Sequence, residues 1–277
     1  MFYRHLSPVF GVAVWLAVTN VALAIQAPKL SDEPNLTDGQ KEEFLLKAQV
    51  VNSRPISKGI THPWRLTLSD GTLTHDAAFV AINVSKLYWK GEDGRSELAF
   101  RDTYHFNIAA RELAKLLGLG DMMPVTVQRT WRGEPGALSW WIPWKWDEQM
   151  RRQQNLQPPD VDAWNNQIYK VRVFAELVYD TDRNLGNQLI TEDWKLWMID
   201  FTRAFRQYHD VKEFRGLTSC DRQLLEKLRQ LDKTELSAKT KSHLSKGEVE
   251  AVMARRDKIV AHFQKLIAEK GENAVLY

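Results

Sequence analysis

Cysteine is nearly absent from this chain, because Cys220 is the only one among its 277 residues. A single cysteine excludes an intrachain disulfide and any zinc site built from cysteine ligands. A strong excess of either charge is also lacking, since the formal net charge is only +3. Nucleic acids and anionic membranes attract strongly basic proteins, so the sequence predicts no nucleic-acid partner.

Several catalytic patterns are missing as well. The seven histidines are scattered and form no H-x-x-x-H or H-E-x-x-H pair, which argues against a zinc hydrolase. No G-x-S-x-G nucleophile elbow and no G-x-G-x-x-G phosphate loop occurs. Asp180 and Asp182 are close in sequence, but no distant partner acid for glycoside hydrolysis can be identified. The common hydrolase classes therefore fit this sequence poorly.

The N-terminus has the pattern of an export signal. Arg4 and His5 form a short positive region, an unbroken apolar run covers 9–18, and an A-x-A signal stands at 22–24. We expect residues 1–24 to be a signal peptide that is removed, which predicts export to the periplasm or the cell exterior. In a eukaryotic cell the destination would be the secretory lumen. Contact with a membrane is expected only if this segment stays uncleaved.

The rest of the chain predicts two lobes. We expect a linker over 25–37, a first lobe over 38–142 and a second lobe over 143–277. Hydrophobic periodicity and turn residues delimit the elements of each lobe. The first lobe should contain helices over 38–51 and 100–119, strands within 64–89, and a hairpin of 124–129 with 136–141. The second should contain helices over 161–179, 220–231 and 247–270, and strands over 188–191 and 195–199.

Three oxygen-bearing side chains, Asp182, Asn187 and Asp200, flank the predicted strand pair 188–191 and 195–199. Such a pair of strands can bring all three to one place. Phosphoryl transfer needs an Asp to orient or deprotonate the acceptor hydroxyl, and an Asn with a second Asp to hold Mg²⁺ on the nucleotide. Kinases carry these residues in the same order. The simpler interpretation is a β-hairpin with an Asx-rich turn.

The stretch Asp182-Arg183-Asn184-Leu185-Gly186-Asn187 resembles the D-R-x-x-x-N catalytic loop of the phosphatidylinositol 3/4-kinase superfamily. Ile199-Asp200-Phe201 resembles its metal-binding I-D-F/H motif. The likeness is clearest over 100–206 and is closest to secreted bacterial proteins with a lipid-kinase-like C-lobe. It implies a two-lobed, α+β protein-kinase-like fold with a small β-rich N-lobe and a mainly helical C-lobe. It also implies ATP, with Mg²⁺ or Mn²⁺ held by Asn187 and Asp200, and Asp182 as the catalytic base.

The sequence departs from this family where the phosphates should be held. A kinase places a Lys on a strand and pairs it with a helix carboxylate. The strand expected at 77–82 contains no Lys, and Val80 stands where the cation should be. Asn107 occupies the family's acidic helix position. We therefore predict Lys86, just beyond the strand, and Glu112, about 140° further round the helix, as the cofactor-binding residues.

Two functions fit these observations. One is an exported kinase-like phosphotransferase that phosphorylates an unknown acceptor, which could be a protein, a lipid or a small molecule. The other is a catalytically reduced kinase-fold module that binds a partner or ligand in the cleft between the lobes. Four tryptophans over 140–146, at the expected crossing between lobes, would either stack on a purine or fill the core there.

Overall fold

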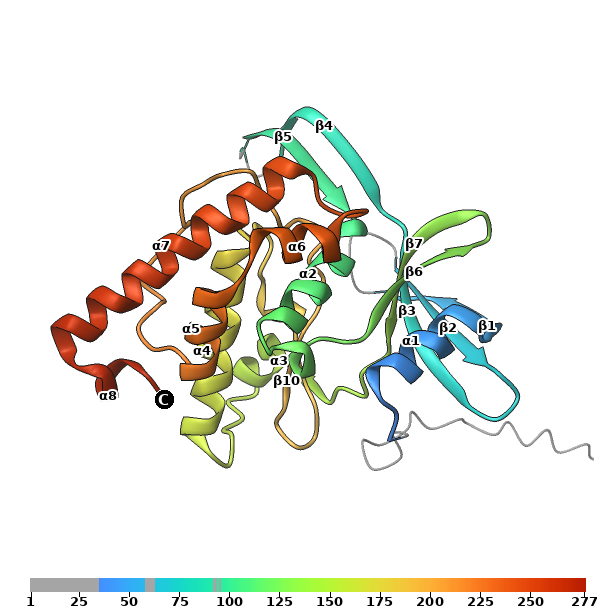
Figure 1. Ribbon diagram of the computed structural model, residues 1–277. Helices are drawn as coiled ribbons and strands as arrows, with labels where there is room; N and C mark the ends of the chain where they lie inside the picture. Colours follow the sequence, from blue (N-terminus) through green and yellow to red (C-terminus); the bar gives the residue numbers. More distant parts are fainter. Residues whose placement is uncertain (1–34, 58–62, 92–93, 95) are drawn as a thin grey trace, which may run out of the picture.

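The computed structural model describes residues 35–57, 63–91, 94 and 96–277. The expected signal peptide, and most of the expected linker, lie outside these residues. The N-terminal part of the described chain is rich in strands and the C-terminal part is mainly helical (Figure 1), which confirms the predicted α+β architecture. None of the helices that the structure describes has both the length and the apolar character needed to cross a bilayer.

A five-stranded antiparallel sheet forms the N-terminal part, in the order β1-β2-β3-β7-β6. Buried residues alternate with more exposed ones along β2 and β3, as in Leu66 and Leu68, and helix α1 packs on β6 and β7. The predicted hairpin 124–129 with 136–141 is confirmed by β6 and β7. The bounds are α1 (Asp38–Lys47), β1 (Gln49–Pro55), β2 (Trp64–Ser69), β3 (Thr74–Val80), β6 (Thr126–Trp131) and β7 (Glu134–Trp140).

Helix α1 is shorter than predicted. It starts as expected, with a capping box between Thr37 and Gln40, but it ends at Lys47 rather than at residue 51. The β-branched pair Val50-Val51 favours an extended chain, and this stretch pairs with β2 instead. Residues 49–55 thus add an edge strand to the sheet that helical spacing alone had hidden.

Two further strands, β4 (Asn83–Lys90) and β5 (Ser96–Thr103), form a separate two-stranded sheet. This β4–β5 arm projects away from the five-stranded sheet (Figure 1). Its strand β5 takes up residues that we predicted as the start of a helix over 100–119. Helix α2 (His105–Leu116) begins only after the arm, because residues 100–103 are paired with β4.

The C-terminal part is built around α4 (Val161–Leu177) and the long α7 (Lys246–Lys270). The main hydrophobic core joins these helices to α2, through side chains such as Phe106, Phe174 and Phe263, which are all fully buried. The predicted helices and the strand pair of this part are confirmed. The remaining elements are α3 (Glu148–Gln153), α5 (Arg222–Gln230), α6 (Lys233–Thr240), α8 (Glu272–Val275), β8 (Trp146–Asp147), β9 (Gln188–Ile190) and β10 (Leu196–Met198).

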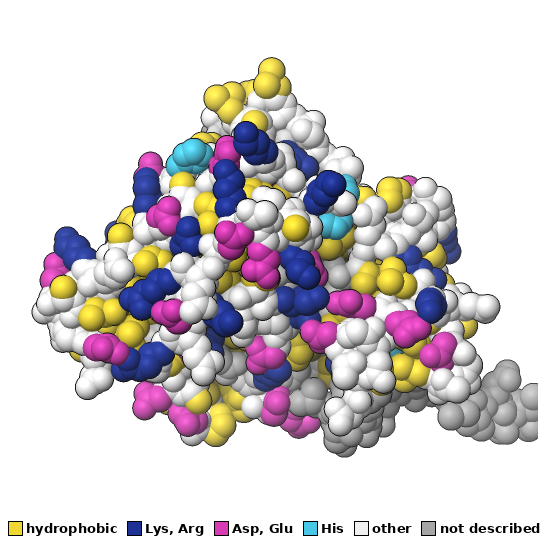
Figure 2. All heavy atoms as spheres, in the orientation of Figure 1, with side chains coloured by type: hydrophobic (Ala, Val, Ile, Leu, Met, Phe, Trp, Pro, Cys, Tyr) yellow, Lys and Arg dark blue, Asp and Glu magenta, His cyan; other side chains and the backbone are white. Residues whose placement is uncertain are grey.

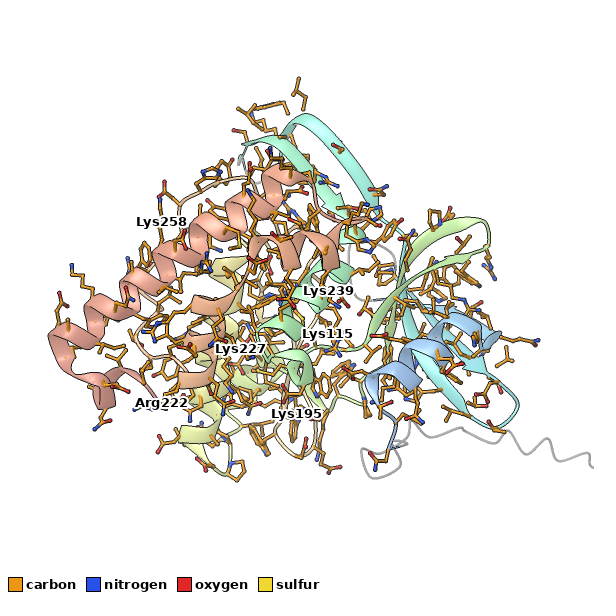
Figure 3. All side chains as sticks on the ribbon, in the orientation of Figure 1. Lys115, Lys195, Arg222, Lys227, Lys239 and Lys258 are labelled. Atoms are coloured by element: carbon orange, nitrogen blue, oxygen red, sulfur yellow. The ribbon has the colours of Figure 1, made fainter. Side chains whose placement is uncertain are left out.

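Charges of both signs are interspersed over the face shown in Figure 2. The cations labelled in Figure 3 come from several elements rather than from one patch. Many are paired: Lys115 lies 3.2 Å from Glu112, and Lys258 contacts Asp210. The hydrophobic side chains at the top of Figure 2 belong to the region of the β4–β5 arm, where Leu87 and Leu98 are 87% and 70% exposed.

Candidate active site

Strands β9 and β10 carry the candidate site. They pair antiparallel, with Leu189 opposite Trp197, and their apolar side chains anchor them in the core. Beyond the pair, the backbone N–H of Ile199 donates to the carbonyl of Asn187 at 3.1 Å. This bond brings Asn187 next to the chain that continues into Asp200, as the sequence predicted for these two residues.

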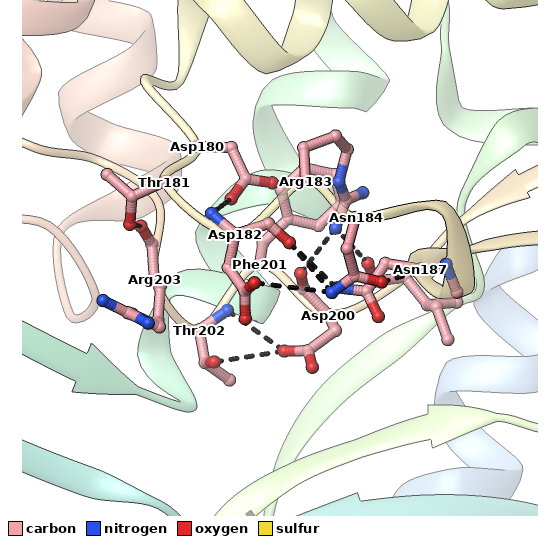
Figure 4. Close-up of polar contacts among 12 residues, drawn as sticks. Asp180, Thr181, Asp182, Arg183, Asn184, Asn187, Asp200, Phe201, Thr202 and Arg203 are labelled. Carbon is pink, nitrogen blue, oxygen red and sulfur yellow. Dashed lines mark hydrogen bonds and ion pairs between the residues drawn. The ribbon is translucent and has the colours of Figure 1, made fainter. Parts of the chain in front are cut away.

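The loop between α4 and β9 is held by an internal clamp (Figure 4). The buried carboxylate of Asp180 accepts from the backbone N–H of Asp182 at 2.9 Å and pairs with Arg183 at 3.0 Å. Arg183 also donates to the carbonyls of Ile199 and Asp200, both at 2.6 Å. One guanidinium therefore fixes the loop that carries Asp182 against the segment that carries Asp200.

The amide of Asn187 is oriented by the same loop. Its nitrogen donates to the carbonyl of Asp182 at 3.1 Å. Since an amide has one donor and one acceptor end, this bond leaves the Asn187 oxygen as the atom available to a cation.

Asp200 has an unusual backbone and an unusual environment. Its φ of 55° lies in the left-handed region, which Asp tolerates better than most residues but which still stores strain. Its carboxylate accepts from the Thr202 hydroxyl at 3.1 Å. Burial raises the pKa of Asp200, and the nearby Arg183 and the Thr202 hydrogen bonds offset only part of that rise. A bound cation would relieve the cost of keeping this carboxylate ionised.

One cavity of about 610 Å³ brings the three predicted residues together. It lies between the five-stranded sheet, represented by Ala78 and Val80 of β3, and the segments that carry Asp182, Asn187 and Asp200. A volume of this size suits a small-molecule ligand. The grouping follows the kinase order of base, then amide, then metal-binding carboxylate.

The other two predicted residues are not at this cavity. Lys86 is exposed on β4, and Glu112 pairs with Lys115 on the outer side of α2. Neither lines the cavity. Their role in cofactor binding stays a prediction that no contact among the described residues supports.

Asn107 holds the position on α2 that faces the cavity. Its side-chain oxygen accepts from the backbone N–H of Phe201 at 2.6 Å. The amide thus ties α2 to the residue after Asp200, in the place where a kinase would use a carboxylate to hold a Lys. Val80 lines the cavity as expected, and β3 contains no Lys.

The tryptophans of 140–146 divide between the two roles considered. Trp140 is 2% exposed and stacks on His75 with ring centroids 3.7 Å apart, so it belongs to the core even though it also borders the cavity. Trp141 and Trp144 are only partly buried and line the cavity. They are the aromatic surfaces that a planar ligand would meet there.

Three residues of the β4–β5 arm, Trp89, Phe100 and Asp102, line the cavity without having been predicted. Burial raises the pKa of Asp102, and its Oδ1 has no hydrogen-bond partner among the described residues. They were not predicted because the two strands of the arm were not predicted as a pair. The sequence G-E-D-G at 91–94, between two strand-like runs, is the signal that favours such a pair.

No family model matches this chain, and no curated protein matches its sequence. Solved structures do match. The structure of hydra Fam20 with sugar is similar over 86% of this chain and 91% of its own, with 14% identity and a TM-score of 0.62. The Helicobacter pylori proinflammatory kinase CtkA is similar over 81% of this chain and 98% of its own, with 10% identity and a TM-score of 0.51. The chain therefore has a kinase-like fold, as predicted.

Proposed function

We propose that this chain is an exported phosphotransferase that uses ATP and Mg²⁺ or Mn²⁺ to phosphorylate a hydroxyl group of an acceptor. The observation that carries the proposal is the single cavity shared by Asp182, Asn187 and Asp200, with one guanidinium clamping the segments that hold them. The D-R-x-x-x-N loop supports the finer assignment to relatives of the phosphatidylinositol 3/4-kinases.

The donor set at the cavity suits a hard divalent cation. Asn187 offers an amide oxygen and Asp200 a partly buried carboxylate, and Mg²⁺ is usually held by one or two carboxylates with phosphates and water completing its shell. A cation there would neutralise charge on the nucleotide phosphates. Asp182 would orient the acceptor hydroxyl and accept its proton, while Arg183 keeps the loop and the Asp200 segment in register.

The acceptor could belong to several classes. A sugar hydroxyl should be tested first, because the hydra Fam20 structure contains a sugar and the cavity here is lined by an aromatic ring, Trp89, and by the Asp102 carboxylate. Aromatic faces and carboxylates are common partners of sugar rings and their hydroxyls. A protein or lipid hydroxyl remains the alternative.

A second function is favoured by a specific observation. The Lys–carboxylate pair of active kinases is replaced by Val80 and by Asn107, whose amide is already bonded to Phe201. A kinase fold without this pair could instead bind a ligand or partner in the cavity without phosphoryl transfer.

Nucleotide binding and turnover, measured together, separate the two functions. The full chain without residues 1–24 is heated with ATP alone and with ATP plus Mg²⁺ or Mn²⁺, and ATP turnover is followed with a panel of sugar, peptide and lipid acceptors. A phosphotransferase gives a metal-dependent rise in melting temperature and acceptor-dependent turnover. Binding without turnover for any acceptor would favour the binding module. The absence of any metal-dependent shift would contradict the phosphotransferase and leave only a module that binds a ligand other than nucleotide.

A further inference from the structure

Positive charge is scarce at the cavity. Among the described residues that line it, the cationic side chains are Arg111 and Arg203. Phosphoryl transfer places several negative charges in one site, and kinases balance part of that charge with a basic side chain as well as with metal. An arginine can take this role only if its guanidinium is not already used in other hydrogen bonds.

Arg111 is already committed. Its side chain is 2% exposed, and its guanidinium donates to the carbonyl of Gly120 and, at 3.1 Å, to that of Met123. It also pairs with Asp38 at the start of α1. These bonds fasten α2 to the neighbouring chain, so moving Arg111 toward a phosphate would break a buried network.

Aromatic rings hold the guanidinium of Arg203 in place, but its hydrogen-bond donors are not used by other described residues. Its guanidinium lies 5.0 Å from the ring centroid of Trp89 and 5.1 Å from that of Phe100, two rings that stack on each other. Its ion-pair partner is Glu97 at 3.8 Å, beyond hydrogen-bond distance, and its charge also acts on the carboxylate of Asp102. Glu97 makes its closer contacts with Arg206. The Arg203 guanidinium donates no hydrogen bond to any other described residue, and its buried Nε has no partner among them.

The backbone of Arg203 fixes its place relative to the predicted base. Its carbonyl accepts from both the backbone N–H and the hydroxyl of Thr181, at 3.4 and 2.9 Å. Because Thr181 immediately precedes Asp182, these two hydrogen bonds hold the backbone of Arg203 close to the backbone of Asp182. In Figure 4 Asp182 lies between the Arg203 side chain and Asn187, and all three residues line the cavity.

We propose that Arg203 is a catalytic residue that binds the phosphoryl group during its transfer, in place of the strand Lys that this chain lacks. The inference rests on the proposed phosphotransferase function. In the step, the acceptor oxygen forms a bond to the γ-phosphorus while the bond from that phosphorus to the β,γ-bridging oxygen breaks. The acceptor proton goes to Asp182, and ADP leaves with the electron pair of the broken bond. Arg203 donates to the equatorial oxygens throughout, where charge develops.

The test compares Arg203→Gln with Arg203→Lys and with Arg215→Gln as a matched control. Arg215 is 91% exposed and pairs with Glu213, away from the residues that line the cavity. Three quantities are measured: the thermal shift with Mg²⁺ and a non-hydrolysable ATP analogue, the shift with Mg²⁺, ADP and aluminium fluoride, and ATP turnover. Aluminium fluoride mimics the phosphoryl group in transfer, so it probes the transition state separately from ground-state binding.

We expect Arg203→Gln to keep the shift with the ATP analogue, to lose the extra shift with aluminium fluoride, and to lower turnover about 10²–10³-fold. Arg203→Lys should recover only part of the loss, because an ammonium group lacks the bidentate fork. Arg215→Gln should match wild type. Arg203→Lys carries the test if the Gln variant does not fold.

Turnover and the aluminium fluoride shift that stay within about twofold of wild type in both Arg203 variants would overturn the inference. Loss of the ATP-analogue shift as well would also overturn it, since Arg203 would then serve ground-state binding. If wild type binds nucleotide without turnover, the aluminium fluoride shift alone decides. If wild type binds no nucleotide with metal, the proposed function fails, and the role of Arg203 fails with it.

Discussion

Asp182 offers the most direct test at the scale of single residues. The change Asp182→Asn keeps the size of the side chain but removes the charge that accepts a proton. Because a positioned base typically contributes 10²–10⁴-fold, turnover should fall by about that factor while metal-dependent nucleotide binding stays near wild type. Asp160→Asn is the control, since Asp160 only caps α4 and Asn caps helices equally well. Turnover that is the same in both variants would show that Asp182 is not the base.

We expect the ionised carboxylate of Asp200 to lower the stability of the folded protein when no cation is bound. Burial raises its pKa, so in the folded protein the proton is held more tightly than in the unfolded chain. The resulting stability is present below that pKa and is lost as the pH rises through it. Once the pH has risen far enough to ionise this carboxylate, its burial is a cost to the folded protein, which Asp200→Asn removes while Asn still tolerates the left-handed backbone.

We therefore expect Asp200→Asn to unfold at the same temperature as wild type or higher without ligand, and to lose the metal-dependent nucleotide shift. Wild type should also lose this shift as the pH falls through the raised pKa, because a protonated carboxyl no longer binds the cation. Thermal scans with and without Mg²⁺ and ATP across pH check both points. A variant that keeps the full shift would remove Asp200 from the metal site.

His105 and His243 form a second pH-sensitive contact, away from the cavity. Their Nδ1 atoms are 3.0 Å apart, so one donates and the other must be unprotonated to accept. Burial and the neighbouring His105 lower the pKa of His243 from 6.5 to about 4, while burial and Arg101 lower that of His105. A lowered histidine pKa means that the unfolded chain binds protons first, so stability falls as the pH drops from 6.5 toward 4.

Urea unfolding at pH 7 and pH 5 measures this effect. The midpoint of wild type should be lower at pH 5, and His243→Gln should show a smaller drop than wild type. An equal drop in the variant would assign the pH dependence to other groups, such as the carboxylates.

At the scale of elements, the sequence predicted those structures whose signal is local. The helices α4, α5 and α7, the β6–β7 hairpin and the β9–β10 pair all have regular apolar spacing bounded by turn or capping residues. The β4–β5 arm was missed because its outer side chains, such as Leu87, are exposed and apolar, so no alternation marks the strands. Asp102 and Trp89 reach the cavity only through the placement of this arm. Arg203 follows the motif closely in sequence, but the absence of a close ion pair at its guanidinium depends on Arg206 pairing with Glu97, which no sequence spacing reveals.

The contact between α2 and the catalytic segment can be tested through Asn107. The change Asn107→Ala leaves the Phe201 N–H without its partner, which typically costs about 1–3 kcal/mol of unfolding free energy. It should also weaken the metal-dependent nucleotide shift, because the chain next to Asp200 loses its anchor. Chemical unfolding measures the first effect and thermal shift the second. Asn165→Ala, at an exposed position of α4, is the control and should be neutral or slightly stabilising. A stability loss equal to that of the control would show that the bond contributes little.

At the scale of the whole molecule, the predicted site depended on the order of three residues in the chain, and the fold brings these three to one cavity. The sequence could not place Lys86 and Glu112. The role of Lys86 required a position just beyond the end of β3, and that of Glu112 required a particular rotation of α2, and the β4–β5 arm changes both. The arm inserts two strands between β3 and α2, which carries Lys86 outward and starts α2 later than expected. Asp182, Asn187 and Asp200 therefore line one cavity, whereas Lys86 and Glu112 do not, and the roles assigned to all five residues stay predictions.

The shared core of α2 with the C-terminal helices has a consequence for motion. Phe106 and Leu113 of α2 are fully buried in the same core as Phe174 and Phe263, so swinging α2 away would open cavities that cost several kcal/mol. In hydrogen–deuterium exchange, α2 should therefore open together with α4 and α7, with amide protection close to theirs, while the edge strand β1 and the β4–β5 arm exchange sooner. If α2 instead exchanged at the rate of the five-stranded sheet, it would move with the N-terminal part of the protein. Because α2 shares its core with α4 and α7, the hydrogen bond between Asn107 and Phe201 should persist for as long as these helices stay folded.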